Sequence, residues 1–291
     1  MAIVQIVLNA LIIGAIYSLI AAGFSLIYST TKIFHFAHGA TLTASVYLFY
    51  FLLSVLGINF YFAAIVTILF ASLFGMAVNV FVYRPFRKRK ATNVILLLSS
   101  IAILAIVESA AVAIFGGDIK TIYLSKPDVG WLFLGARITP SQLSVIIVSI
   151  ISLLLLWLFL KKTVHGKAIR AVADNVELAE IVGLDKEKVF NKAFFLGSLL
   201  AGISAVLLAI EFNVKPTIGS EFLIKGFASA IIGGINSVAG AVLGAYALGG
   251  AENTGAWLVS SEFKNAVAFV LLFIFLIFRP NGLLGTRRQV S

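Results

Sequence analysis

The chain has 291 residues, of which 61% are hydrophobic and 12% are charged, and its net charge is +10. Soluble domains average about 25% charged residues, so this composition, with several apolar runs near 20 residues, excludes a soluble globular protein and predicts an all-α polytopic membrane protein. The absence of cysteine excludes disulfides, thiol catalysis and thiolate metal sites, and the positive charge is attributed to cytoplasmic loops rather than to nucleic-acid binding.

The apolar segments predict one transmembrane domain over residues 1–291, with eight or nine membrane helices. In chain order the segments lie at 4–29, 40–56, 60–83, 94–115, 143–160, 193–211, 222–235, 238–258 and 263–279. The segment 222–235 is short for a full crossing and ends at Gly233–Gly234. We therefore expect one short or broken helix in this part of the chain.

The positions of Lys and Arg predict how the chain is oriented. Sixteen of the 22 fall at Lys32, in 84–90, in 161–192 and in the tail from 279, and four fall in the loops on the opposite side. Because basic residues collect on the cytoplasmic side, we expect the N-terminus outside, the C-terminus inside, nine crossings and an extracytoplasmic loop at 116–142. If 222–235 is instead re-entrant, there are eight crossings and the termini share a side.

Two similar short sequences, GATLTA at 39–44 and GAVLGA at 240–245, each follow an interruption of the helical pattern. Matched interruptions in two halves of a chain are typical of a transporter's substrate path. Small residues are also common in membrane helices because they allow close packing. An internal repeat and a chance similarity are both compatible with this pattern.

A charged segment at 166–189 interrupts the apolar sequence, with nine charged residues in 24 positions. Asp174 and Glu177 fit a capping box, and Gly183 suits the left-handed residue after a helix end. We therefore expect a helix over residues 175–182, followed by a second helix that Asp185 caps.

The predicted short helix carries more apolar surface than a solvated loop requires, at Val176, Leu178, Ile181 and Val182. One interpretation is a helix that lies flat on the membrane surface. The other is a docking element for a cytoplasmic partner, in which apolar side chains fill a groove.

Several motifs carry a resemblance to a known family. The run ELAEIVG, from Glu177 to Gly183, resembles the EAA-x-x-x-G signature of ABC importer permeases, although Leu178 replaces its middle Ala and the usual Ile-x-Leu-Pro continuation is absent. Four further stretches are similar to branched-chain amino-acid permeases and keep their order: FHFAHG at 34–39, GKAIRAVADN at 166–175, GGINSVAGAVLGA at 233–245 and FRPNGLLG at 278–285. The chain resembles the LivH-type permease subunits of these importers.

The resemblance implies a permease of the prokaryotic inner membrane that imports branched-chain or other neutral amino acids. It implies four kinds of partner: two cytoplasmic ABC ATPase subunits, a related LivM-type permease subunit, an extracytoplasmic substrate-binding protein and membrane lipid. The coupling loop is 161–192, and the implied coupling residues are Arg170, Asp174, Val176, Glu177, Ala179 and Gly183. The resemblance implies that Phe36, His38 and Gly39 belong to the path or gate, although the same residues could simply form a turn between two helices. Gly233 and Gly234, which permit either a helix break beside the substrate or close packing, and the intramembrane Glu252 are further candidates for the path.

No enzymatic site or cofactor is expected. The chain has no G-x-x-x-x-G-K-[ST] sequence, so ATP hydrolysis belongs to partner subunits. His35 and His38 lack enough further ligands for a metal site, because only His165 remains.

Glu108 and Glu252 lie within apolar spans, where an ionisable group indicates function by default. Each carboxyl could line a path or bond to neighbouring helices. They also keep open a competing hypothesis, a proton-coupled secondary transporter of small apolar solutes, and a passive channel is a third.

Overall fold

A computed structural model of the chain describes residues 2–122, 130–133, 135–258, 260, 263–279 and 281–284. The chain divides into two compact units. Unit 1 comprises Met1–Ser25, Leu124–Ser152 and Ile224–Ser291, and unit 2 comprises Leu26–Tyr123 and Leu153–Leu223.

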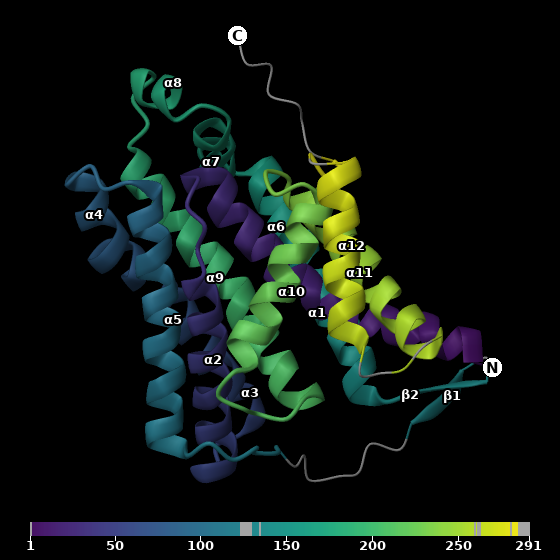
Figure 1. The fold of residues 1–291 in the computed structure, drawn as a ribbon. Coiled ribbons are helices and arrows are strands. Elements are labelled where there is room, and N and C mark those ends of the chain that lie inside the picture. The colour runs from purple at the N-terminus through teal and green to yellow at the C-terminus, as the bar shows by residue number, and fades with distance from the viewer. Residues whose placement is uncertain are drawn as a thin grey trace. The chain divides into compact units, whose positions relative to one another are not determined.

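The described elements are helical apart from one short strand pair (Figure 1). In chain order they are α1 (Ala2–Thr31), α2 (Ala37–Tyr50), the π-helix η1 (Phe51–Val55), α3 (Phe60–Val78), the π-helix η2 (Asn79–Tyr83), α4 (Arg84–Lys88), α5 (Asn93–Phe115), β1 (Trp131–Phe133), β2 (Ala136–Ile138), α6 (Pro140–Lys162), α7 (Val164–Asp174), α8 (Val176–Ile181), α9 (Lys186–Glu211), α10 (Ile218–Gly233), α11 (Val238–Leu258) and α12 (Lys264–Phe278).

The predicted all-α polytopic fold is confirmed. Among the described residues, six helices are long and apolar enough to cross a membrane: Ile3–Thr31, Ala37–Val55, Phe60–Lys88, Asn93–Phe115, Pro140–Lys162 and Lys186–Glu211. Helices α10 and α11 pass the same test as a pair, but they are bent by 114° at the predicted break, and α12 is a shorter apolar helix. Helices form in all these segments because lipid offers no partners for backbone N–H and C=O groups.

Unit 2 is a helix bundle built around α9, the most buried of its long helices. Helix α3 packs along α9, and α2 packs against α3, α5 and α9. A Cβ added at Gly202 would lie 2.9 Å from the Cα of Ile68. Glycine therefore lets the backbones of α3 and α9 approach closely, as small residues do in membrane helix pairs.

The count of Lys and Arg assigns the loops of unit 2 to two opposite sides of the membrane. In the structure, loops assigned to the same side lie at the same end of the unit. At one end, Arg87 of α4 binds Glu187 at the start of α9. At the other end, Lys120 and Val214 exchange backbone hydrogen bonds of 2.9 and 2.8 Å. The segments 84–90 and 161–192 therefore lie together, as do the segments around residues 120 and 214.

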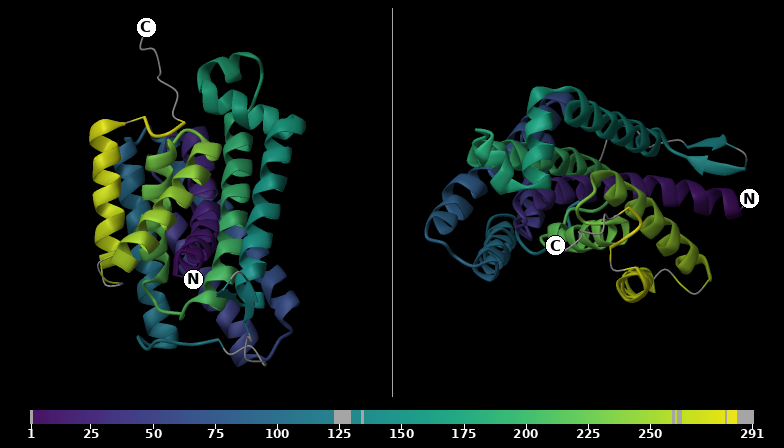
Figure 2. Two further views of the ribbon diagram at one scale, coloured as in Figure 1. Left: turned by 90° about the vertical axis from the view of Figure 1, so that its right-hand side faces the viewer. Right: turned by 90° about the horizontal axis from the view of Figure 1, so that it is seen from above.

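Unit 1 contains the strand pair, which was not predicted from the sequence. Strands β1 and β2 pair antiparallel, with Trp131 opposite Ile138, and the pair lies beside the first turns of α1 (Figure 2). The Gln5 side chain donates to the Arg137 carbonyl at 3.2 Å and accepts from its N–H at 2.9 Å. The expected loop 116–142 therefore holds a hairpin and the start of α6, whereas its residues 123–129 and 134 lie outside the described part of the chain.

Candidate functional sites

The expected coupling loop forms two short helices, α7 and α8, which precede α9 in the chain. Helices α7 and α8 lie together at the end of unit 2 where α9 begins (Figure 1). Helix α7 begins after Thr163, whose hydroxyl accepts from the Gly166 N–H at 2.9 Å. It buries Ile169 and Val172 and leaves Arg170 exposed, so one face of the amphipathic helix packs and the other is solvated.

The predicted capping box at Asp174 is wrong. Asp174 is the last residue of α7, and Asn175 caps α8 instead. The Asn175 Oδ1 accepts from the N–H groups of Glu177 and Leu178, at 2.9 and 3.1 Å. The physical reason is that α7 continues through Asp174, so the extended residue that an N-cap requires falls one position later.

The other end of α8 follows the prediction. Gly183 has a φ of +86°, its N–H donates to the Glu180 carbonyl, and the Leu184 N–H donates to the Ala179 carbonyl. This is the Schellman pattern of a helix ended by a left-handed glycine. The helix spans Val176–Ile181, slightly shorter than the expected 175–182.

Asp185 caps α9, as predicted. Its Oδ1 accepts from the N–H groups of Glu187 and Lys188. The hydrogen bond from the Lys188 backbone lowers the pKa of this exposed carboxyl. A depressed pKa means that the cap stabilises the folded state above the ordinary Asp pKa and is lost only as the pH falls through the lowered value. The cap is therefore fully ionised at neutral pH.

Three apolar side chains of α8 and its C-cap are exposed, beside the exposed Glu177 and Glu180. The side chains of Leu178, Ile181 and Val182 are 59%, 79% and 76% exposed, whereas Ala179 is buried. Of the other expected coupling residues, Glu177 and Gly183 are exposed and Val176 is half-buried. The sequence analysis named Leu178, Ile181 and Val182 as apolar residues that could fill a partner's groove, but the expected coupling residues did not include them. The structure shows that all three are exposed.

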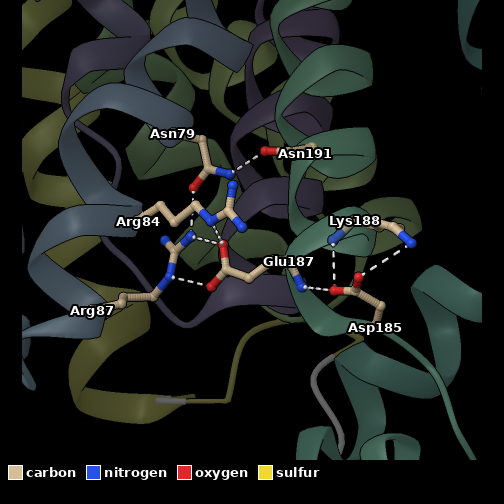
Figure 3. A network of polar contacts seen from close by, with 7 residues as sticks. All are labelled: Asn79, Arg84, Arg87, Asp185, Glu187, Lys188 and Asn191. Atoms are coloured by element: carbon tan, nitrogen blue, oxygen red, sulfur yellow. Dashed lines mark hydrogen bonds and ion pairs between the residues drawn. The ribbon is translucent and has the colours of Figure 1, made fainter.

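A polar network ties the start of α9 to the basic segment after α3 (Figure 3). Arg87 donates to both oxygens of Glu187, at 3.1 and 2.7 Å. The Arg84 Nε lies 3.8 Å from the same carboxylate, and the Asn79 amide donates to Asn191 at 2.7 Å. The sequence indicated only topology for the basic run at 84–90, because nothing local showed its acidic partner 100 residues away.

The first interruption, between α1 and α2, is packed, and the side chains of His35 and His38 are fully buried. The His35 Nδ1 lies 2.9 Å from the Tyr83 hydroxyl, and its ring meets that of His38 at a centroid distance of 5.9 Å. The Phe36 N–H donates to the Ser100 hydroxyl at 3.2 Å. The interruption is therefore held by side chains of η2 and α5.

Gly39, in the first turn of α2, lies at a close approach to the start of α10. A Cβ at this position would lie 3.0 Å from the Gly219 carbonyl oxygen. The Thr43 hydroxyl accepts from the Gly219 N–H at 3.1 Å. The sequence interpretation missed Gly219 and Thr43, because only the tertiary structure brings residues 176 positions apart together.

The second interruption is the turn between α10 and α11. Gly234 has a φ of +110°, and a Cβ on Gly233 would collide with the Gly240 backbone. The chain's last described residues cover this turn, because the Leu283 N–H donates to the Ile232 carbonyl and the Leu284 N–H to the Gly233 carbonyl. Residues 283 and 284 of the motif at 278–285 therefore bind the chain where the motif at 233–245 begins.

Glu252 is buried and bonded to neighbouring helices of unit 1. Tyr17 donates to its Oε2 at 2.8 Å, and the Lys225 ammonium lies 3.4 Å from its Oε1. The Lys225 side chain is itself only 11% exposed. The opposite charge satisfies Glu252 locally, as is usual for an ionisable group inside a membrane.

Glu108 is half-buried in α5. Its carboxylate accepts from the Ser220 N–H at 3.3 Å, in the first turn of α10. A carboxylate at a helix start is stabilised by the helix dipole, so Glu108 also has a structural partner.

The fold and these sites define a multi-pass helical membrane protein with a broken helix pair and, in a charged loop, a short helix with exposed apolar side chains. A family model described as "Branched-chain amino acid transport system / permease component" matches residues 6–276. The chain therefore belongs to this family of transport permease components.

Individual relatives agree over nearly the whole chain. The high-affinity branched-chain amino acid transport system permease protein BraD of Pseudomonas aeruginosa is 32% identical, over 97% of this chain and 95% of its own. The corresponding permease protein LivH of Salmonella typhimurium is 30% identical with the same coverage. The chain also resembles a solved structure of PsaBC from Streptococcus pneumoniae in complex with Fab, at 16% identity and a TM-score of 0.51, over 94% of this chain and 91% of that one. This last likeness concerns the fold alone.

Proposed function

We propose that this chain is a membrane-spanning subunit of a binding-protein-dependent ABC importer for branched-chain or other neutral amino acids. The substrate class rests on the relatives, which are named for branched-chain amino acid transport. The observation that carries the ABC mechanism is α8, a six-residue helix with caps at both ends and exposed apolar side chains. Isolated helices this short are marginal in water, so this one is suited to docking against a partner.

Cytoplasmic ATPase subunits, two per importer, bind α8. Leu178 and Ile181 of α8 and the C-cap residue Val182 enter a groove on the ATPase, and the exposed charges of Glu177 and of Arg170 in α7 set the register. A related LivM-type permease completes the membrane part, and an extracytoplasmic binding protein delivers substrate to the loop 116–142. The assembly lies in the prokaryotic inner membrane.

Coupling follows the hydrogen bonds that leave α8. Displacement of α8 reaches α9 through Glu180, whose carboxylate accepts from the Lys186 ammonium at 3.0 Å, and the paired Arg87 and Glu187 carry it to α4 and α3. Bidentate Arg–carboxylate pairs have a fixed geometry, which makes this contact suitable for transmitting movement. The path then opens and closes at the helix interruptions that contain Phe36, His38 and Gly39, and Gly233 and Gly234.

The competing hypothesis of proton-coupled transport needs Glu108 or Glu252 to exchange protons with water. Glu252 is instead bonded to Lys225 and Tyr17 in the interior of unit 1. These contacts support bonding to neighbouring helices as the role of Glu252 more than a role in the path.

The first experiment is a mild-detergent pull-down of the full chain from its native membrane, followed by mass spectrometry. We expect ATPases with Walker motifs, a related permease and a binding protein in the same sample. Recovery of the chain alone, as a stable species, would contradict the ABC assignment.

Variants then test the docking surface. Replacing Ile181 with Asp should abolish ATPase recovery and ATP-driven uptake, because it places a charge among the exposed apolar side chains of α8. Val164→Asp is the matched control, since Val164 is exposed to the same extent, 78% against 79%, but lies on α7. Glu177→Lys should also uncouple uptake, because it reverses the charge at the start of α8. Normal ATP-driven uptake by both α8 variants would remove the docking role.

A further inference from the structure

An open cavity of about 440 Å³ lies on unit 2, next to the polar network, whose residue Asn191 also lines it. Its inner walls are apolar and come from Met76 of α3, Phe159 of α6 and Phe195 and Leu196 of α9. Its volume is within the range of about 300–1,000 Å³ that is typical of small-molecule sites.

The rim of the cavity is basic. Lys188 and Lys192 lie one helical turn apart on α9, on the same face. The Lys192 ammonium is 2.8 Å from the Nδ1 of His165 at the start of α7. Lys188 also pairs with Asp185 at 3.4 Å, as Figure 3 shows, but both side chains are exposed and such a pair is weak. The rim therefore offers two cations and one imidazole.

Along α9, the residues that line the cavity change from charged to apolar, as expected where a helix passes from the lipid headgroups into the hydrocarbon. From Lys188 to Leu196 is eight residues of α9, which corresponds to about 12 Å at 1.5 Å per residue. On α6, the Lys161 ammonium sits 4.7 Å from the centre of the Trp157 ring, and Trp and Lys together are typical of a membrane–water interface. The cations therefore lie at headgroup level, with the apolar walls below them.

We propose that this cavity binds one anionic phospholipid. Its phosphate lies against Lys188 and Lys192, and the upper part of one acyl chain lies between Phe159, Met76 and Leu196. A free phosphate ion would leave the apolar walls unfilled, and a zwitterionic lipid would bring a second cation to a basic rim. The inference depends on the chain spanning a membrane and not on which substrate it carries.

The test uses the assembled importer in nanodiscs of phosphatidylcholine with added phosphatidylglycerol that carries a photoreactive acyl chain. Native mass spectrometry counts the retained phosphatidylglycerol, and peptide mapping locates the crosslinks. We expect crosslinks in α3 and α9. Each lysine near an anionic lipid contributes a factor of roughly five in affinity, so K188Q/K192Q should lower retention by about an order of magnitude or more.

Two further variants separate this site from general charge effects. K161Q/K162Q removes the same charge from neighbouring residues that do not line the cavity, and it should leave retention unchanged. Leu196→Trp fills the apolar part without changing charge and should abolish the crosslinks while the importer still assembles. Equal losses in the two lysine pairs, equal retention of phosphatidylcholine, or crosslinks that persist in the Leu196→Trp variant would overturn the proposal. So would capture of a protein subunit by a photoreactive amino acid placed at Phe159.

Discussion

Arg87 and Glu187 are the residues whose pairing sets the position of α9 at its charged end. Both side chains are largely buried, at 17% and 22% exposure, and they share two hydrogen bonds. Hydrogen bonds between charged groups contribute more to the stability of the folded protein than hydrogen bonds between neutral groups do. The pair therefore stabilises unit 2 and connects α9 to α4.

A double-mutant cycle on Arg87→Ala and Glu187→Ala should give a coupling energy of about 1–3 kcal/mol. The measurement is thermal or denaturant unfolding of the purified importer, together with the ratio of uptake to ATP hydrolysis. Each single variant should also lower that ratio, because α9 loses its attachment to α4. Lys88→Ala is the control, since Lys88 is exposed on the same helix. Additive effects of the two substitutions would show that the contact does not matter in the membrane.

Glu252 and Lys225 form the buried pair of unit 1, and the pair can be distinguished from a transport site. Removing one member leaves an uncompensated charge, so Lys225→Met or Glu252→Gln alone should destabilise the protein by about 3–5 kcal/mol. The double variant should recover most of this stability, because a neutral pair needs no counter-charge. Uptake that recovers along with stability would indicate a packing role. Restored stability without uptake would instead place Glu252 in the substrate path.

At the scale of elements, α8 depends on Asn175 and not on Asp174. Asn175→Ala should cost about 1 kcal/mol of helix stability, which corresponds to roughly a fivefold weaker binding of the ATPase. Asp174→Ala should change binding by less than about twofold, because Asp174 ends the preceding helix. Titration of the permease complex with the purified ATPase measures the change in binding for both variants. The reverse order of effects would restore the capping box at Asp174.

The α10–α11 turn depends on glycine because two helix backbones meet there. Gly233→Ala should destabilise the protein by about 1–3 kcal/mol, since its Cβ would collide with Gly240. Gly250 is a half-buried residue of α11 at which an added Cβ would meet nothing within 4 Å. Gly250→Ala should therefore be neutral or slightly stabilising, because Ala favours helix. Comparing the free energies of unfolding of the two variants tests this prediction. Equal stability would mean that the helices separate easily at the turn.

At the scale of the whole molecule, the open question is whether the chain crosses eight or nine times. The hydrogen bonds from Leu283 and Leu284 to the end of α10 put the tail and the α10–α11 turn at one level of unit 1. A re-entrant α10 would leave its turn within the bilayer and draw the tail into lipid. This pairing favours nine crossings with a cytoplasmic C-terminus.

Single-cysteine labelling tests this topology directly, because the chain contains no cysteine of its own. We expect Lys90→Cys, Lys167→Cys, Asn236→Cys and Leu284→Cys to react only with reagents that reach the cytoplasm. Lys120→Cys and Arg137→Cys should react from outside. Labelling of Leu284→Cys from outside, with Lys167→Cys still cytoplasmic, would establish eight crossings.

The sequence by itself determined the elements that local physics controls. The apolar spans agree with the observed helices to within a few residues at most ends, because each helix satisfies its own backbone in lipid. The end of α8 at Gly183 and the cap at Asp185 were also predictable, since caps act over three or four residues. The start of α8 was misplaced by one residue because two adjacent positions, Asp174 and Asn175, both suit an N-cap.

Only the tertiary structure decided which distant groups meet. Tyr17 and Glu252 are 235 positions apart, Arg87 and Glu187 are 100 apart, and the tail reaches back to α10 across α11 and α12. A local pattern shows that a charge or a glycine lies in a membrane helix, but its partner depends on how the helices pack. The same packing created the cavity beside Lys188 and Lys192, which no single helix contains.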